Sequence, residues 1–385
     1  MPEQLNVAQG SFSLVRLPER RNELLRAWDA ADEYLLQHLA ENNLPAESAK
    51  VLIINDSFGA LAIALASFKP QAWSDSYLAQ QATRVNLQQN GLNENAVRLV
   101  DSTQLPEGIF DVVLIKAPKT LAFLEDLLLR LRPQLTASTK IIVAGMLKHL
   151  PASVWALLER LIGPTTSSLA KKKARLIFTC MNPALAVPHN PYPSSYTLEN
   201  TAYQIINHAN VFSRAQLDIG TRFFLEHLPT HAPARTIVDL GCGNGIVGIV
   251  AATRNPKATL VFVDESFMAI ASARENFAQA FGEQRSAIFN TGDGLHDFAP
   301  GSTELVLCNP PFHQQQTIGD HIAVTLFRQT HSALAPNGEL WVIGNRHLGY
   351  QASLQKLFGN CTLVASNQKF VVLKAVRKPT RHPPH

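Results

Sequence analysis

The chain has 385 residues, of which 46% are hydrophobic and 17% are charged, so it can bury a full core and is not a disordered protein. A chain of this length favours two domains over one. The formal net charge of +4 is compatible with a polyanionic partner but does not require one.

The cysteines and the apolar segments exclude several protein classes. No close Cys or His spacing suggests a zinc site or a disulfide framework, because the four cysteines lie far apart in the chain, at Cys180, Cys242, Cys308 and Cys361. The chain starts without the basic and apolar regions of a signal peptide, and no apolar run reaches the roughly 20 residues of a membrane span. We expect a cytoplasmic protein with no metal and no membrane partner, and we expect it to be monomeric.

The first half of the chain alternates between predicted strands and helices. Apolar residues recur with helical spacing over residues 19–42. The elements expected after this helix are a strand at 51–54, a helix at 60–68, a strand at 72–75, a helix at 76–90, strands at 97–100 and 112–115, a helix at 121–131 and a strand at 140–144. This alternation predicts a parallel sheet covered by helices.

A change of composition marks a domain junction. Residues 182–195 are rich in Pro, Asn, Ser and His. We place a first domain at residues 1–185, a Pro-rich linker at 186–200 and a second domain at 201–378. The last residues, 379–385, are expected to form a flexible basic tail.

The second half repeats the alternation of the first. The expected elements are a strand at 203–208, a helix at 212–228, a strand at 236–240, a glycine-rich loop at 241–245, a helix at 246–253 and a strand at 260–264. When the halves are aligned by eye, Gly59 falls against Gly245, Asp75-Ser76 against Asp264-Glu265, and Asn86 against Asn276. Such a long internal repeat indicates duplicated domains.

The glycine-rich loop predicts a cofactor site. Gly241, Gly243 and Gly245 let the backbone turn tightly and approach a ligand, and Asn244 lies between them. The preceding Asp239 would repel a pyrophosphate but could neutralise the α-ammonium of S-adenosylmethionine. At the next strand ends, Asp264 could bind the ribose diol and Asp293 the adenine amine. The expected cofactor-binding residues are therefore Asp239, Gly241, Gly243, Asn244, Gly245, Asp264, Asp293 and the neighbouring Asn309.

The strand at 305–308 runs into Asn309-Pro310-Pro311-Phe312, where two prolines force the chain out of the sheet. If the Asn309 side-chain oxygen and the Pro310 carbonyl each accept one N–H of an exocyclic amine, the amine lone pair can turn towards a methyl donor. Phe312 would stack on the base. We expect Asn309, Pro310 and Phe312 to be catalytic.

The corresponding strand end in the first half carries Lys116, which cannot accept these hydrogen bonds. Asn55 and Ser57 also replace loop glycines, so we expect the first half to bind no S-adenosylmethionine. Its basic residues suggest a substrate-holding or stabilising role. The candidate substrate-binding residues are Lys171, Lys172, Lys173 and Arg175 in this half, with Phe312 and His313 in the second.

Together these residues resemble a known family. The run from Asp239 to Gly245, combined with Asn309 to Phe312, is similar to class I S-adenosylmethionine-dependent methyltransferases of planar amines. With Asp218, Gly220 and the degenerate first copy, the chain resembles the bacterial tandem-domain ribosomal RNA guanine-N2 methyltransferases, most of all those of the large subunit. The resemblance extends over nearly the whole chain, up to Lys378.

This resemblance implies two tandem class I, Rossmann-like α/β methyltransferase domains, each a mostly parallel seven-stranded sheet with helices on both faces. It also implies 2-methylguanosine in 23S rRNA as the product and a silent first copy that assists RNA binding. Three alternatives stay open: a small-subunit (16S) rRNA enzyme, a protein-glutamine methyltransferase, and a non-enzymatic RNA-binding protein.

Overall fold

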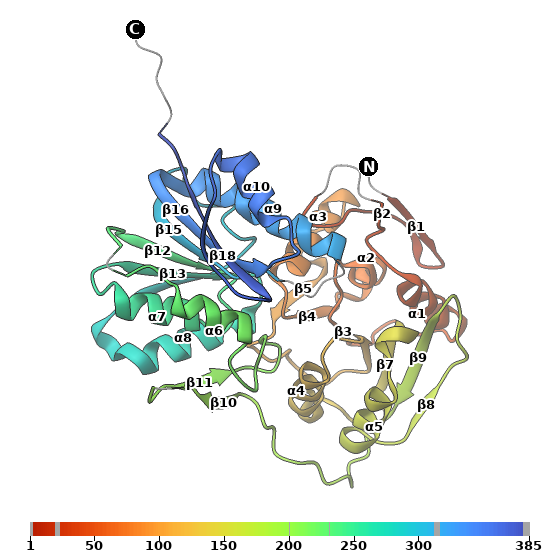
Figure 1. The fold of residues 1–385 in the computed structure, drawn as a ribbon. Helices are drawn as coiled ribbons and strands as arrows, with labels where there is room; N and C mark the ends of the chain where they lie inside the picture. The colour runs from red at the N-terminus through yellow and green to blue at the C-terminus, as the bar shows by residue number, and fades with distance from the viewer. Residues whose placement is uncertain (1–2, 20–23, 200, 231, 312–315, 380–385) are drawn as a thin grey trace. The chain divides into compact units, whose positions relative to one another are not determined.

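The computed structural model describes residues 3–19, 24–199, 201–230, 232–311 and 316–379. The chain divides into two compact units, residues 1–192 and 193–385, each with its own sheet (Figure 1). The strand β10, Ser194–Thr197, lies within the stretch expected to be a linker and belongs to the second unit.

The first unit has a seven-stranded sheet in the order β5-β4-β3-β6-β7-β9-β8. Strand β9 runs in the opposite direction to the other six strands. A hairpin, β1 (Glu3–Val7) and β2 (Gly10–Leu14), precedes it. The strands are β3 Val51–Ile54, β4 Gln71–Ser74, β5 Arg98–Asp101, β6 Val112–Lys116, β7 Lys140–Met146, β8 Thr165–Ser167 and β9 Ala174–Thr179. The helices are α1 Ala30–Glu41, α2 Ala60–Ala64, α3 Tyr77–Gln89, α4 Leu121–Leu131 and α5 Ala152–Leu161.

The second unit has the matching order β14-β13-β12-β15-β16-β18-β17 and is also preceded by a hairpin, β10 with β11 (Gln204–Asn207). The strands are β12 Thr236–Leu240, β13 Thr259–Asp264, β14 Ala287–Thr291, β15 Thr303–Cys308, β16 Leu334–Asn345, β17 Thr362–Ser366 and β18 Phe370–Val376. The helices are α6 Ile219–Glu226, α7 Ile246–Arg254, α8 Phe267–Phe281, α9 Gln316–Ala333 and α10 Tyr350–Phe358.

Both faces of each sheet are covered. In the second unit, alternate strand residues join two separate cores: Ile237 and Phe262 pack with α6, α7 and α8, whereas Val238 and Val261 pack with α9 and α10. In the first unit, Ile53 belongs to the core under α1 and α2, and its neighbour Ile54 is fully buried on the opposite face. The predicted α/β fold with two mostly parallel seven-stranded sheets is confirmed.

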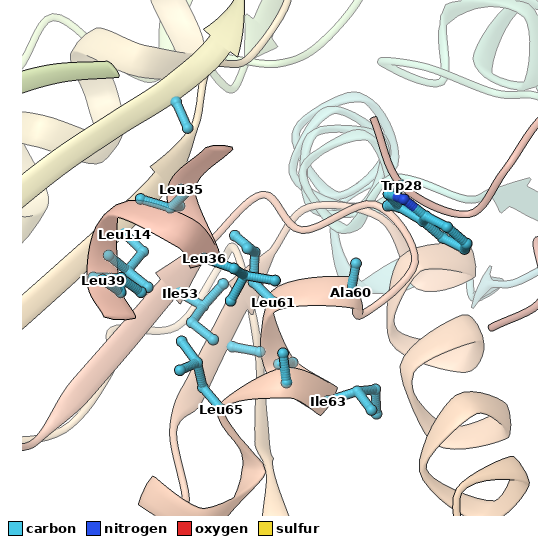
Figure 2. Close-up of a cluster of buried hydrophobic side chains, with 14 of the residues drawn as sticks. Trp28, Leu35, Leu36, Leu39, Ile53, Ala60, Leu61, Ile63, Leu65 and Leu114 are labelled. Atoms are coloured by element: carbon cyan, nitrogen blue, oxygen red, sulfur yellow. The ribbon is translucent and has the colours of Figure 1, made fainter. Parts of the chain in front are cut away.

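Leu35, Leu36 and Leu39 fix helix α1 to the first sheet. All three are completely buried, and they belong to the core cluster of Figure 2 that also contains Ile53 and Leu61. A fully buried leucine contributes about 1.5–3 kcal/mol relative to an exposed one. These leucines therefore fix α1 against the first sheet.

Two predicted helix starts were wrong for one physical reason. The helix expected from residue 19 begins at Ala30, and the helix expected from residue 212 begins at Ile219. In each case an aspartate, Asp29 or Asp218, has extended backbone and accepts hydrogen bonds from the first turn as the N-cap. The apolar residues upstream of these caps, such as the 89% exposed Leu24, lie outside the helices.

Candidate active site

Four adjacent parallel strands of the second sheet end side by side. In sheet order they are β14, β13, β12 and β15, and the order of the strands reverses between β12 and β15. Ligands of open α/β sheets bind at such a switch point. The structure thus brings together four predicted features at one edge: Asp293, Asp264, the glycine loop and Asn309.

The glycine loop leaves open space above its first two glycines. Gly241, Gly243 and Gly245 have φ of 71°, 53° and 80°, the left-handed region that favours glycine. A Cβ on Gly243 would meet nothing within 4 Å, and one on Gly241 would come only within 3.8 Å of the Asn309 carbonyl oxygen. A Cβ on Gly245 would instead clash with Ala273 at 2.9 Å. Gly241 and Gly243 therefore suit close approach by a ligand, and Gly245 serves helix packing.

Asp264 links the loop to the following helix. Its Oδ2 accepts a hydrogen bond from the Gly243 N–H at 2.9 Å, and its Oδ1 accepts one from the Ser266 N–H at 3.0 Å. The carboxylate is thereby held against the glycine loop at the end of β13, within reach of a ligand bound there.

Asp239 lies beneath the loop. Its side chain is buried, and its Oδ2 accepts a hydrogen bond from the Gly248 N–H at 2.7 Å in the first turn of α7. Burial raises the pKa of this carboxyl to about 8. The observed contact of Asp239 is with α7, and its contact with a cofactor stays a prediction.

Asn244 is turned into the protein rather than towards the open space. It is 7% exposed, and its Nδ2 donates to the Asn207 Oδ1 at 2.9 Å. Asn276 Nδ2 donates both to the Asn244 carbonyl and to Ile206 of β11, at 2.9 Å each. This amide cluster ties the β10–β11 hairpin to the glycine loop.

The sequence reasoning missed the role of Asn276, although a signal was present. In the first unit Asn86 makes the equivalent pair of bonds, from its Nδ2 to the carbonyls of Val15 and Phe58 at 3.0 and 2.8 Å. Asn86 and Asn276 were matched in the alignment of the halves. In each unit this amide joins the loop after the first sheet strand to the preceding hairpin, at Ile206 within β11 or at Val15 just after β2.

Asp293 lies two residues beyond β14, and burial raises the pKa of its carboxyl. The preceding Gly292 donates its N–H to the Asp264 carbonyl at 2.9 Å, and a Cβ there would meet nothing within 4 Å. Asp293 therefore stands next to Asp264 at the open part of the edge.

Asn309 carries an unpaired acceptor. Its Nδ2 donates to the Thr221 Oγ1 at 2.9 Å, whereas its Oδ1 is buried with no hydrogen-bond partner among the described residues. A buried acceptor without a partner carries a desolvation penalty of about 1–3 kcal/mol, so it indicates a site for a missing donor. Pro310 is buried next to it, while Phe312 and His313 lie outside the described residues.

The register of the sheets confirms that Lys116 is the counterpart of Asn309. Ile54 pairs with Ile115 in the first sheet, and Leu240 pairs with Cys308 in the second, so Lys116 and Asn309 each follow by one residue. The alignment by eye was one residue out at the second strand. Trp73 and Val263 are equivalent partners, so the counterpart of Asp264 is Ser74 and not Asp75.

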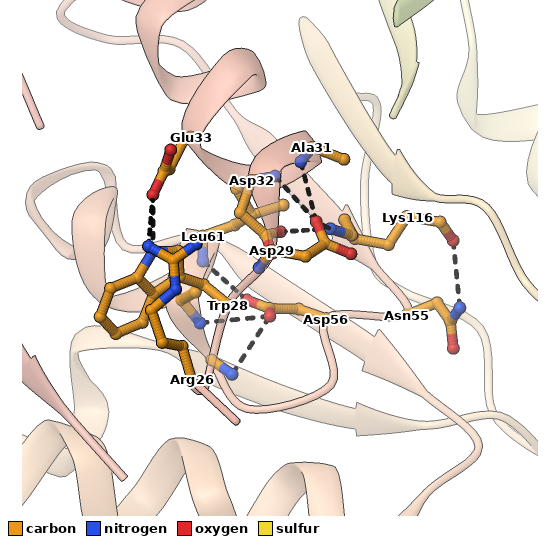
Figure 3. A network of polar contacts seen from close by, with 12 residues as sticks. Arg26, Trp28, Asp29, Ala31, Asp32, Glu33, Asn55, Asp56, Leu61 and Lys116 are labelled. Carbon is orange, nitrogen blue, oxygen red and sulfur yellow. Dashed lines mark hydrogen bonds and ion pairs between the residues drawn. The ribbon is translucent and has the colours of Figure 1, made fainter. Parts of the chain in front are cut away.

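Lys116 is held in an ion-pair cluster (Figure 3). Its Nζ lies 2.8 Å from Asp29 Oδ1 and 2.6 Å from Asp32 Oδ1, and its side chain is 12% exposed. Burial opposes the charged form, but the two aspartates outweigh it and raise the pKa of Lys116. Burial also raises the pKa of Asp32, to about 6. The cation is neutralised within its own unit.

The loop of the first unit carries polar side chains that bond to the backbone. The buried Asp56 accepts hydrogen bonds from the four backbone N–H groups of residues 59–62, at 2.9 to 3.2 Å. Asn55 has the left-handed φ of 64° where the second unit has Gly241, and its Nδ2 donates to the Lys116 carbonyl at 3.0 Å. In the first unit, therefore, two side chains of this loop make hydrogen bonds to backbone groups of their own unit.

The predicted basic substrate-binding residues lie in the β8–β9 turn and the start of β9. Lys171, Lys172 and Lys173 are exposed, although Lys171 donates to Gln37 at 2.7 Å and Lys172 pairs with Glu33 at 3.1 Å. Arg175 differs, because its Nε is buried without an acceptor in the described part of the chain.

Two further features bear on the expected function. Within the described residues, no three His, Cys, Asp or Glu side chains come together as metal ligands. In the same part of the chain, no helix is both long enough and apolar enough to cross a membrane.

Comparison with known proteins identifies the family. Residues 2–183 match the RLMG N-terminal domain and residues 202–374 match the methyltransferase small domain. Ribosomal RNA large subunit methyltransferase G from Ectopseudomonas mendocina is 54% identical over 366 residues, which cover 95% of this chain and 97% of that protein. The protein of the same name from Streptomyces griseus is 49% identical over 382 residues, covering 97% of this chain and all of that protein.

A solved structure shares the fold of the whole chain. It is a T. thermophilus 16S rRNA N2 methyltransferase (RsmC) in complex with AdoMet and guanosine, with a TM-score of 0.76, 19% identity and 98% coverage of both chains. The tandem α/β architecture is thus that of a known methyltransferase structure. By its close relatives and both matching domains, the chain belongs to the ribosomal RNA large subunit methyltransferase G family.

Proposed function

We propose that this protein transfers a methyl group from S-adenosylmethionine to the exocyclic N2 of a guanine in 23S rRNA, giving 2-methylguanosine. The observation that carries the proposal is the Oδ1 of Asn309, which is buried and has no partner among the described residues, beside an open glycine loop. The names of the relatives support a large-subunit rRNA substrate. The N2 position and the cofactor are those named for the fold neighbour.

The residues at the strand ends fit the cofactor. S-adenosylmethionine, when bound, supplies an electrophilic methyl group. The open backbone at Gly241 and Gly243 would receive the ligand without a Cβ clash. Asp264, fixed by Gly243 and Ser266, would accept the ribose hydroxyls, and Asp293 would accept the adenine amine.

Asn309 and Pro310 would activate the guanine amine. The lone pair of an exocyclic amine is delocalised into the ring, so the free base is a poor nucleophile. If the Asn309 Oδ1 and the Pro310 carbonyl each accept one N–H, the nitrogen is drawn towards tetrahedral geometry and its lone pair is released from the ring plane. Phe312 would stack on the base and His313 would flank it.

We further propose that residues 201–378 perform catalysis and that residues 1–185 hold the RNA. Lys119 and Lys148 follow neighbouring strands of the first sheet, and the backbone of Lys173 accepts a hydrogen bond from the Leu147 N–H at 2.8 Å. Burial and the nearby lysines lower the pKa of His149 at this edge. A concentration of positive charge suits phosphate contacts. The expected monomeric state and cytoplasmic location stay predictions.

The proposal is tested by supplying methyl-labelled S-adenosylmethionine to the full chain with protein-free 23S rRNA, 16S rRNA or total cell protein. We expect label in 23S rRNA, at N2 of a single guanine that lacks the methyl group in cells without the protein. Label in 16S rRNA would indicate the small-subunit alternative, and label in protein the glutamine alternative. No label in any arm, together with no cofactor binding, would favour the non-enzymatic alternative.

A further inference from the structure

We infer that Thr221 and Asp218, at the N-terminus of α6, are positioning residues that hold the Asn309 amide with its oxygen facing the substrate amine. The inference rests on the proposed amine-accepting role of Asn309. Both residues lie outside the Asn-Pro-Pro-Phe loop, and they would set the orientation of the Asn309 side chain.

The hydrogen-bond chain has only one consistent direction. The Thr221 Oγ1 lies 2.9 Å from the Asn309 Nδ2 and 3.3 Å from the Asp218 Oδ2. A carboxylate only accepts, so the single hydroxyl hydrogen of Thr221 points to Asp218. The hydroxyl must then accept from Asn309. Its partner is therefore the amide nitrogen, and the amide oxygen is left on the other side.

Asp218 is itself fixed in place. Its Oδ2 also accepts a hydrogen bond from the Thr221 backbone N–H at 2.8 Å, as the N-cap of α6. A Cβ at Gly220 would come within 3.0 Å of this oxygen and 3.1 Å of the Phe370 ring, so glycine leaves room for the carboxylate. Thr221 is 6% exposed, so little water competes for its hydroxyl.

The first unit has the same arrangement with different groups. Asp29 is the N-cap of α1, as Asp218 is of α6, and Asp32 stands three residues later, as Thr221 does. Asp29 and Asp32 contact Lys116, the counterpart of Asn309. In both units, therefore, residues at the start of the lead-in helix contact the residue at the end of the fourth sheet strand, Lys116 or Asn309.

The test compares Thr221→Val and Thr221→Ser in the full chain. Valine keeps the shape but removes the acceptor, whereas serine keeps it. Thr253→Val is the matched control, because Thr253 is exposed on α7 and its hydroxyl donates within its own helix, to the Ile249 carbonyl. The measurements are kcat and KM for rRNA methylation, the Kd for S-adenosylmethionine, and the unfolding midpoint. If the valine variant does not fold, Thr221→Ala takes its place.

We expect Thr221→Val to lower kcat about 10- to 100-fold, because a small misplacement of an acceptor has effects of this size. The Kd for the cofactor should change by less than about 2-fold, and Thr221→Ser and Thr253→Val should keep kcat within about 3-fold of wild type. A normal kcat in the valine or alanine variant, a serine variant as slow as valine, or a parallel loss of cofactor affinity would overturn the inference. Failure of the wild-type chain to methylate rRNA would instead count against the proposed function.

Discussion

The two halves of the chain share a strand order and a capped lead-in helix, but they treat the end of the fourth sheet strand in opposite ways. In the first half, Lys116 is neutralised by Asp29 and Asp32. In the second half, Asn309 has a partner for its nitrogen and none among the described residues for its oxygen. The same scaffold therefore holds two different residues at this position. They differ in whether a polar side-chain atom can still bond to a ligand.

The same contrast holds at the loop after the first sheet strand. Asp56 accepts the N–H groups at the start of α2, whereas the loop with Gly241 and Gly243 keeps its space open. Functional sites often retain groups that the protein itself does not satisfy. In the first half the corresponding groups make internal contacts instead, an arrangement that favours stability over binding.

The largest expected effect comes from placing the Lys116 ion-pair cluster of the first half at the equivalent position of the second half. Asn309→Lys buries a cation beside Thr221 and should destabilise the protein by about 3–5 kcal/mol, because its partners are incomplete. Adding Thr221→Asp recreates the Asp-Asp-Lys set and should recover part of this loss. Denaturant unfolding of the full chain measures both variants. A double variant that is less stable than the single one would show that the two positions are not equivalent. Methylation of rRNA by either variant would show that Asn309 is not needed for catalysis.

The converse change tests the first half. Lys116→Met leaves Asp29 and Asp32 without their cation and should lower the free energy of unfolding by about 3 kcal/mol at neutral pH. Lys119→Met is the control, because Lys119 is exposed on the loop that follows β6 and its loss should cost less than about 0.5 kcal/mol. Equal stability of the two variants would show that the ion-pair cluster does not stabilise this unit.

Asp239 should make the stability of the ligand-free protein depend on pH. The pKa of its carboxyl rises from 3.8 to about 8 on folding, because the group is buried. Between these values the unfolded chain loses the proton while the folded chain keeps it, so stability falls as the pH rises. Asp239→Asn keeps an acceptor for Gly248 and should reduce this fall by at least about 1 kcal/mol. Identical pH profiles of the two proteins in denaturant unfolding would contradict this assignment.

The smallest effect is expected at the basic turn of the first unit. Replacing Lys171, Lys172 and Lys173 by Gln should weaken rRNA binding and reduce the slope of log K against log salt by up to about 2, at roughly 0.7 per lost phosphate contact. Two of these lysines already contact Gln37 and Glu33, so the reduction should be less than the full value for three contacts. An unchanged slope would remove this turn from the RNA-binding surface.

Patterns within a single element were enough to predict much of the fold. The helix Leu121–Leu131 and the strand Thr236–Leu240 have the predicted bounds, because an apolar period and a buried run are local signals. The starts of α1 and α6 were missed because apolar residues continue upstream of each cap. The capping box of Asp29 and Asp32 was a readable signal, since both residues are polar and three apart.

The sequence was enough to place the candidate residues at one edge of the sheet, but not to show which other residues hold them. The glycines, Asp264, Asp293 and Asn309 follow strand ends, which topology brings to one edge. The contact between Thr221 and Asn309 joins residues 88 positions apart, and no local pattern indicates such a pair. The contact of Asn244 with Asn207 was not predictable either, because a sequence does not show which side of a loop is buried.

The most direct test of the account is the Asn309→Ala variant, measured for S-adenosylmethionine binding and for rRNA methylation in the same preparation. Removing the unpaired acceptor should leave the cofactor Kd within about 3-fold of wild type and lower kcat about 100- to 1,000-fold, the size of effect seen when one preorganised hydrogen-bonding group is removed. A variant that binds the cofactor and methylates rRNA at the wild-type rate would contradict the proposal that the Asn309 oxygen, which has no partner among the described residues, activates the substrate amine.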